Sequence, residues 1–313
     1  MVLYISYKTC KTGLIAYASA RQLDQYGRPI AGYINFCPRG TASYMSEHAS
    51  TGLSTTMHEI THALVFSSTL YQYYRNWDTG KLRGLSNVVK DYTVKTDSLN
   101  VRATGKIKRI ITPGVVAATR AHYGCSSLTG AALENNGGSG TAGSHWEKRA
   151  LMTEYMTSGG SSEITGAFVS PISLALFQDS GWYRVSMKSA DLNLWGYKAG
   201  CSFANAQCPK SDNLQVGTFC KTKNEIGVSV DRSAPAFCYM GQRCVACYLF
   251  LKLFLIFTLE HIPSNMGKCG YMRQTKVTKS GGGGAHAGGG NGGEISCAKE
   301  WWSSGSATRA HGT

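Results

Sequence analysis

The segment from Met57 to Leu64 carries the clearest chemistry, because it contains H-E-x-x-H, with histidines at 58 and 62. On a helix, side chains four residues apart lie on the same face, so His58 and His62 can bind one zinc ion. Glu59 then lies beside the metal as a general base. Zinc lowers the pKa of its bound water to ~7, and Glu59 can accept the proton as hydroxide attacks a carbonyl. The pattern predicts metal-assisted hydrolysis of amide bonds.

Two histidines are too few for a catalytic zinc site, which has three protein ligands and an open position for water. The metzincin pattern places a glycine and a third histidine shortly after the second, but here those positions hold Val65 and Ser68. The third ligand must therefore come from farther away. The candidates are His48, His122, His145, His261, His286 and His311.

A helix is expected to present the motif. Ser54 and Thr55 are available as N-caps, and apolar residues recur at helical spacing at Met57, Ile60, Ala63 and Leu64. This periodicity predicts that those four residues form the buried face. Before the helix, residues 14–18 and 30–36 are expected to form two strands joined by a turn at 24–29.

Composition excludes wholesale disorder, because 42% of the 313 residues are hydrophobic and 11% are aromatic. The formal net charge is +14, and residues 81–120 contribute half of it. We interpret this stretch as a solvated basic face, and expect no nucleic-acid partner because no binding motif accompanies it. Such a face could still attract acidic substrates or anionic surfaces.

Nine of the eleven cysteines lie at or after Cys125, which favours disulfides in an oxidising compartment. The first ten residues contain no recognisable secretory signal. The apolar run at 245–259 has 15 residues and includes Lys252, so a buried helix or strand pair is favoured over a membrane span. Residues 281–293, with nine glycines, are expected to be disordered, and residues after about 245 to lie outside the cooperative fold.

His145 stands in a G-S-H-W sequence, and Met156 follows eleven residues later. With the H-E-x-x-H motif, this combination resembles the leishmanolysin family of surface metalloproteases, in which an insertion separates the second and third zinc histidines. Further segments that resemble the family are 27–35, 63–67, 122–125, 179–183 and 200–203. The resemblance covers roughly residues 10 to 244.

The resemblance implies a zinc endopeptidase that binds one Zn²⁺ through His58, His62 and His145 and uses Glu59 as its base. It also implies that Met156 of a Met-turn is the hydrophobic floor beneath the metal, and that Cys125 and Cys201 form a disulfide. Substrates would be proteins or peptides. The location would be secreted or at the cell surface.

Two residues depart from the family pattern. Val65 replaces a glycine after the zinc helix, so either the helix continues or the turn is strained, because β-branched residues disfavour positive φ. Arg21 stands where relatives usually have a cysteine, which could leave Cys10 or Cys37 without its partner. The family's signal peptide and most of its pro-segment are also not seen in this sequence. Val65 and this truncation leave an alternative function, a catalytically inactive surface or adhesion module with the same fold.

The fold class we expect is α+β, a metzincin-like zinc peptidase with a long insertion between the second and third ligands. Residues 1–67 would form an N-terminal catalytic subdomain with the zinc helix. Residues 68–207 would form a central domain that carries the third ligand and the Met-turn. Residues 208–313 would form a cysteine-rich C-terminal region.

Overall fold

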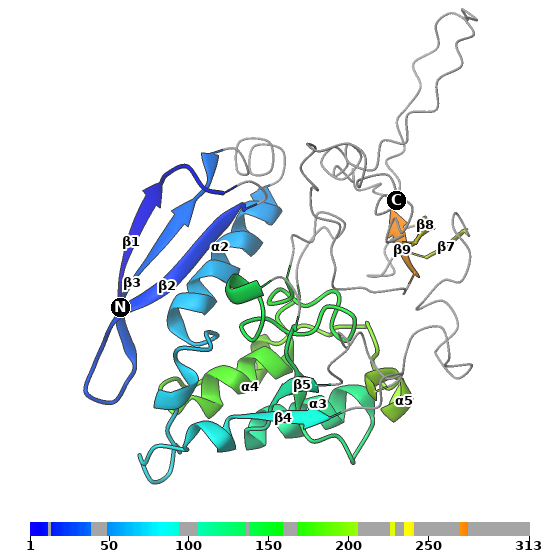
Figure 1. Cartoon of the computed structure of the whole chain (residues 1–313). Coiled ribbons are helices and arrows are strands. Elements are labelled where there is room, and N and C mark those ends of the chain that lie inside the picture. The colour runs from blue at the N-terminus through cyan, green and yellow to red at the C-terminus, as the bar shows by residue number, and fades with distance from the viewer. Residues whose placement is uncertain are drawn as a thin grey trace, which may run out of the picture.

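The computed structural model describes residues 1–11, 14–38, 49–93, 106–135, 138–158, 168–205, 226–228, 235–240 and 270–274 (Figure 1). Helices and strands are mixed along the chain, as the α+β prediction requires. The apolar run at 245–259 and the glycine-rich segment at 281–293 lie outside the described residues.

The first sheet contains three strands in the order β1-β3-β2: β1 (Val2–Tyr7), β2 (Ala16–Leu23) and β3 (Pro29–Phe36). β2 and β3 form the predicted antiparallel hairpin, whereas β1 pairs in parallel with β3 and had no sequence signal. The turn between β2 and β3 is fixed by the Asp24 carboxylate, which accepts hydrogen bonds from the backbone N–H groups of Tyr26 and Arg28. Gly27 in this turn has φ +81°, a conformation that glycine adopts without strain.

The H-E-x-x-H segment lies on α2 (Ala49–Leu64), which begins before the predicted caps. α2 lies between the first sheet and the central part of the chain (Figure 1). The predicted burial of Met57 is wrong, because its side chain is 37% exposed, and Ile60 and Leu64 are half-buried. Neighbours on two sides bury Glu59 and Thr61 together with Ala63, so the buried surface of α2 is not a simple apolar stripe.

Val65 introduces no backbone strain after α2. The helix ends at Leu64, and the N–H groups of Val65 and Phe66 both donate to the Thr61 carbonyl at 2.9 Å. Among the described non-glycine residues only Lys198 has a positive φ, so the strained turn, one of the two alternatives at Val65, is wrong. The valine side chain is instead buried in the core.

The central part combines a second sheet with several short helices. Its strands β4 (Val89–Thr93), β5 (Lys106–Ile110) and β6 (Ala131–Ala132) are antiparallel. The α-helices are α3 (Pro113–Tyr123), α4 (Pro171–Asp179) and α5 (Gly200–Asn205), and the 3-10 helices are η1 (Tyr71–Tyr73), η2 (Leu85–Asn87), η3 (Gly138–Gly140) and η4 (Met187–Ser189). A third antiparallel sheet consists of β7 (Ile226–Val228), β8 (Pro235–Met240) and β9 (Gly270–Gln274).

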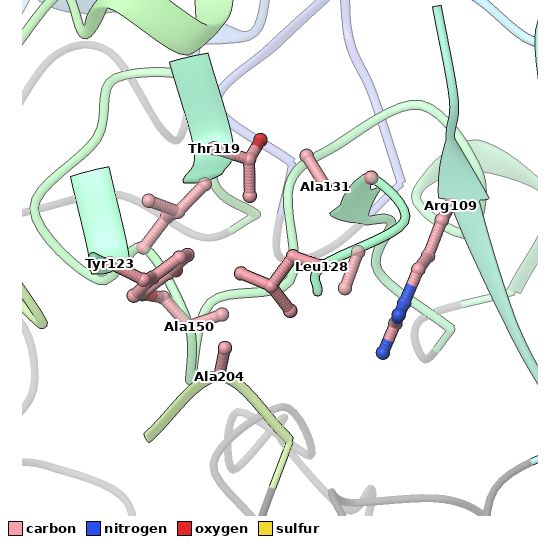
Figure 2. A pocket seen from close by; sticks show the side chains of 10 residues that line it. Arg109, Thr119, Tyr123, Leu128, Ala131, Ala150 and Ala204 are labelled. Atoms are coloured by element: carbon pink, nitrogen blue, oxygen red, sulfur yellow. The ribbon is translucent and has the colours of Figure 1, made fainter. Parts of the chain in front are cut away.

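Most buried apolar side chains belong to one cluster in the central part, which includes Phe66, Trp146, Leu151, Met156 and Leu176. Beside it lies a cavity of about 10 Å³, lined by side chains that include Arg109, Tyr123, Leu128 and Ala204 (Figure 2). This volume suits about one water molecule, so the cavity is too small for a peptide.

The basic stretch is only partly a solvated face. Arg109 is 8% exposed and donates to Thr129 Oγ1 and Asn205 Oδ1. Arg83 donates from Nε to backbone carbonyls of Arg75 and Asp179. These guanidinium groups hold loops and helix ends together, which the charge count alone did not reveal.

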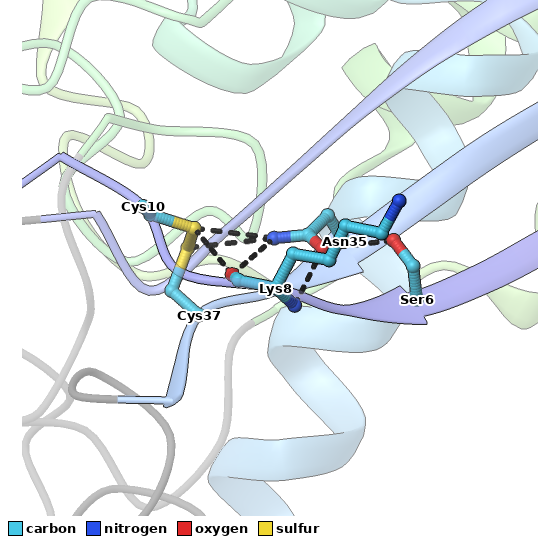
Figure 3. Close-up of a disulfide and its surroundings, with 5 residues drawn as sticks. All are labelled: Ser6, Lys8, Cys10, Asn35 and Cys37. Carbon is cyan, nitrogen blue, oxygen red and sulfur yellow. Dashed lines mark hydrogen bonds between the residues drawn. A yellow bond between two sulfur atoms is a disulfide. The ribbon is translucent and has the colours of Figure 1, made fainter.

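Two disulfides are present in the described residues. Cys125–Cys201 is the predicted bond and joins the end of α3 to α5. Cys10 and Cys37 pair with each other, so the expectation that Arg21 leaves one of them without a partner is wrong. Arg21 stacks on the Tyr33 ring at 4.4 Å instead. The buried Asn35 side chain contacts Ser6, Lys8 and this disulfide, and thereby holds the end of β1 against β3 (Figure 3).

Candidate metal centre

The imidazoles of His58, His62 and His145 converge. His58 and His62 come from adjacent turns of α2, and His145 follows η3 in the central part. The Nε2 atom of His58 lies 3.0 Å from Nε2 of His62 and 3.1 Å from that of His145, and the third distance is 3.2 Å. The structure thus brings together two nitrogens from one helix and a third from 83 residues farther along the chain.

Each of the three rings is oriented by a hydrogen bond from Nδ1 to a backbone carbonyl. His58 donates to Tyr155 at 2.6 Å, and His62 donates to Phe66 at 2.8 Å. His145 donates to the Thr141 carbonyl at 2.9 Å. Because a carbonyl can only accept, the proton of each neutral ring is assigned to Nδ1, which leaves a lone pair on every Nε2. Metal-binding histidines are oriented in the same way.

Burial keeps these histidines neutral. It lowers the pKa of His58 and His62, and it lowers the pKa of His145 to about 3. A neutral imidazole is the form that binds a metal, so no proton has to be removed first.

The donor set fits a single zinc ion. Tetrahedral zinc with Zn–N bonds of ~2.0–2.1 Å separates its ligand nitrogens by roughly 3.3 Å, close to the spacing of the three Nε2 atoms. In the part of the chain that the structure describes, this is the one group of three or more histidine, cysteine or acidic side chains close enough to share a metal ion. Three nitrogen ligands leave the fourth tetrahedral position open.

Glu59 adds a carboxylate next to the histidines. Its side chain is 6% exposed, and among the residues that the structure describes Oε2 has no hydrogen-bond partner. Burial raises its pKa to about 8. An unpartnered buried oxygen is costly and uncommon in a folded protein, and such atoms occur at sites that interact with a ligand. The arrangement could therefore move a proton beside a bound metal.

The segment around Met156 contacts His58 and the residue that follows His145. Met156 is fully buried, and its carbonyl accepts a hydrogen bond from the Trp146 N–H at 3.0 Å. The Trp146 ring packs on Phe66 at a centroid distance of 4.5 Å. Trp146, which follows His145, thus contacts Phe66, whose carbonyl accepts the hydrogen bond from His62.

The other candidate histidines do not join this cluster or lie outside the described residues. His122 is buried, and one ring nitrogen, Nε2, bonds to the Trp195 carbonyl at 2.9 Å. The remaining four, His48, His261, His286 and His311, are outside the described residues. Sequence reasoning missed the acceptors Tyr155, Phe66 and Thr141, because every residue has a backbone carbonyl and no residue type signals this use.

A mixed α and β fold with a three-histidine centre and an adjacent glutamate defines a metallopeptidase type of site. The sequence profile of the leishmanolysin family matches residues 1–248, and the chain belongs to this family of metallopeptidases.

Several curated relatives show the same similarity. The chain is 39% identical over 234 residues to the leishmanolysin-like peptidase of Drosophila melanogaster, an alignment that covers 66% of this chain and 33% of the relative. It is 35% identical over 195 residues to the ciliated left-right organizer metallopeptidase of Mus musculus, which covers 61% of this chain and 26% of the relative. It is 28% identical over 226 residues to leishmanolysin of Leishmania chagasi, which covers 72% of this chain and 34% of the relative. The chain thus spans between about a quarter and a third of the length of these relatives.

Proposed function

We propose that this chain carries the catalytic centre of a zinc-dependent metalloendopeptidase, which cleaves peptide bonds within proteins. The observation that supports this most is the convergence of three Nε2 atoms beside a buried glutamate oxygen that has no partner within the described part of the chain. His58, His62 and His145 would hold one Zn²⁺.

Zinc bound there would polarise the scissile carbonyl and acidify water. The charge of a zinc ion held there would favour the ionised carboxylate. Glu59 then accepts a proton from the attacking water at Oε2, and returns it to the leaving amine. The Nδ1 hydrogen bonds keep the three rings from rotating during this reaction. Met156 provides an apolar floor beneath the histidines.

The substrates we propose are proteins or peptides, at a secreted or cell-surface location. Two disulfides in the structure support an oxidising compartment. Within the described residues, no helix is both long and apolar enough to cross a membrane. Exposed lysines of the basic stretch, such as Lys81, support attraction to anionic surfaces. We also retain the division into segments 1–67, 68–207 and 208–313 as a proposal.

The alternative, an inactive surface or adhesion module, depended chiefly on Val65. Because Val65 fits after α2 without a positive φ, it gives no reason for a loss of activity. Val65 therefore does not support the inactive module.

A casein assay tests the proposal. The full chain, purified with its disulfides intact, should hydrolyse casein, lose activity with a zinc chelator such as 1,10-phenanthroline, and regain it when zinc is added back. The Glu59→Ala variant is the matched control for a contaminating protease, because it should be inactive in the same preparation. A wild-type chain that binds zinc but cleaves nothing would support the inactive module.

A further inference from the structure

Glu154 is a buried carboxylate that the proposed reaction does not use directly. It lies two residues before Met156 and is fully enclosed. Oε2 accepts a hydrogen bond from the Met156 N–H at 2.6 Å. Oε1 accepts from the Ser170 N–H at 3.3 Å, from Ser170 Oγ at 3.0 Å and from Ser173 Oγ.

These contacts fix the carboxylate in one orientation. Ser170 is the N-cap of α4, and Ser173 lies in its first turn, so Oε1 is held at the positive end of a helix. Ser173 Oγ also accepts a hydrogen bond from Trp146 Nε1 at 2.8 Å, next to His145. Oε2 is then left to face the Met-turn.

The group that receives this contact also holds a histidine. The Met156 N–H and the Tyr155 carbonyl belong to one peptide group, which is planar and rigid and points its N–H and C=O in opposite directions. On one side this peptide donates to Glu154. On the other side its carbonyl accepts from His58 Nδ1 at 2.6 Å. A single peptide therefore separates the carboxylate from His58.

We propose that Glu154 is a positioning residue of the metal centre: through the Tyr155–Met156 peptide it orients His58 and strengthens the binding of the metal. This inference rests on the proposed function, since it assigns Glu154 to the same centre. A hydrogen bond from N–H to a carboxylate polarises the peptide, so its carbonyl becomes a stronger acceptor for the His58 proton. Carboxylates that contact metal-binding histidines directly raise their basicity in the same sense.

The other two histidines provide a contrast within the molecule. His62 donates to the Phe66 carbonyl, and the N–H of that peptide, on Ser67, donates to the neutral Val65 carbonyl at 2.9 Å. His145 donates to the Thr141 carbonyl, whose peptide N–H, on Ala142, donates to the Gly138 carbonyl at 2.9 Å. Only the peptide behind His58 is supported by a carboxylate.

The decisive variant is Glu154→Gln in the full chain. An amide offers one acceptor oxygen and adds two donors, so it cannot bind both the serines and the Met156 N–H. The matched control is Ser170→Ala, which removes a donor to Oε1 and the cap of α4 but keeps the charge and the contact with Met156. Zinc affinity is measured by competition with a chromophoric chelator, and the Nδ1–H signals are observed by NMR on zinc-loaded chain labelled with ¹⁵N-histidine.

We expect Glu154→Gln to weaken zinc binding ~10–100-fold and to shift one of the three Nδ1–H signals, that of His58. Ser170→Ala should leave zinc affinity and all three signals close to those of the wild type, because the Ser170 N–H and Ser173 Oγ still hold Oε1. If Glu154→Gln does not fold, Glu154→Asp serves as the second variant, because its shorter side chain cannot reach both partners and should shift the same signal.

Wild-type affinity and unshifted signals in the variant that folds would overturn the inference. An equal loss in Ser170→Ala would also overturn it, because the effect would then be general destabilisation. A wild-type chain without zinc affinity would instead refute the proposed function, so the two failures are distinguishable.

Discussion

The residues of the candidate metal centre come from two regions that differ in how they are held. His58 and His62 lie on α2, which packs on a three-stranded sheet. The edge strand β1 of that sheet exposes large side chains, among them Tyr4 at 66% and Ile5 at 71%. His145 lies in a segment with little regular structure, but its neighbours Trp146 and Leu151 are fully buried. The regular region is the exposed one, and the irregular region is the buried one.

This difference shows two ways to position a side chain. On α2, backbone geometry alone sets the relation between His58 and His62. His145 depends on contacts between distant segments, because its carbonyl accepts from the Glu134 N–H at 2.8 Å and Trp146 bonds to Met156. We therefore expect changes in the buried region to affect the metal centre more than equal changes in the sheet.

The largest effect is expected for His145 itself. His145→Ala should abolish stoichiometric zinc and peptidase activity together, because the two α2 histidines alone bind a metal weakly. Glu59→Ala should retain zinc and lose activity, since Glu59 moves protons and does not bind the metal. Zinc content by atomic absorption and casein hydrolysis measure both. Undiminished zinc in His145→Ala would show that another residue is the ligand.

Removing each disulfide in turn compares the stability that the two regions gain from their cross-links. Cys125–Cys201 closes 76 residues in the central part, and Cys10–Cys37 closes 27 in the sheet. Loop-closure entropy alone makes the longer bond more stabilising by ~1 kcal/mol, within a total of ~2–5 kcal/mol for either bond. Urea unfolding of the two double Cys→Ser variants measures the difference. Zinc affinity should fall only when Cys125–Cys201 is removed. A larger loss of unfolding free energy from removing Cys10–Cys37 would contradict this expectation.

The sequence predicted the local part of the site and the hairpin, for physical reasons. The H-E-x-x-H spacing specifies a relation within one helix, and the residues around Gly27 specify a turn. β1 gave no signal, because it pairs in parallel with β3 and no adjacent turn encodes that contact. His145 could be singled out among six histidines only through the family resemblance. The contacts of Glu154 depend on segments that meet only in the folded chain.

Two buried hydrogen-bonding side chains allow a smaller, matched comparison. Trp146→Phe removes the donor to Ser173 Oγ in the central part. Asn35→Ala removes the contacts with Ser6 and Lys8 in the sheet. Each should lower the free energy of unfolding by ~1–3 kcal/mol.

Only Trp146→Phe should weaken zinc binding as well, because Trp146 adjoins His145 and packs on Phe66. Urea unfolding and chelator competition on the same samples provide both numbers. Equal effects of the two variants on zinc affinity would mean that the sheet and the central part support the metal centre equally.

The smallest effect is expected at Met57, where apolar periodicity predicted burial and the structure exposes the side chain. Met57→Lys should change the free energy of unfolding by less than about 0.5 kcal/mol, as exposed positions do. Ala63→Leu on the same helix is the matched comparison, because Ala63 is fully buried and its Cβ faces the backbone of Gly32 in β3. Overpacking there should cost ~1–3 kcal/mol. Urea midpoints of the two variants measure this contrast directly. If Met57→Lys were as destabilising as Ala63→Leu, Met57 would be buried in solution.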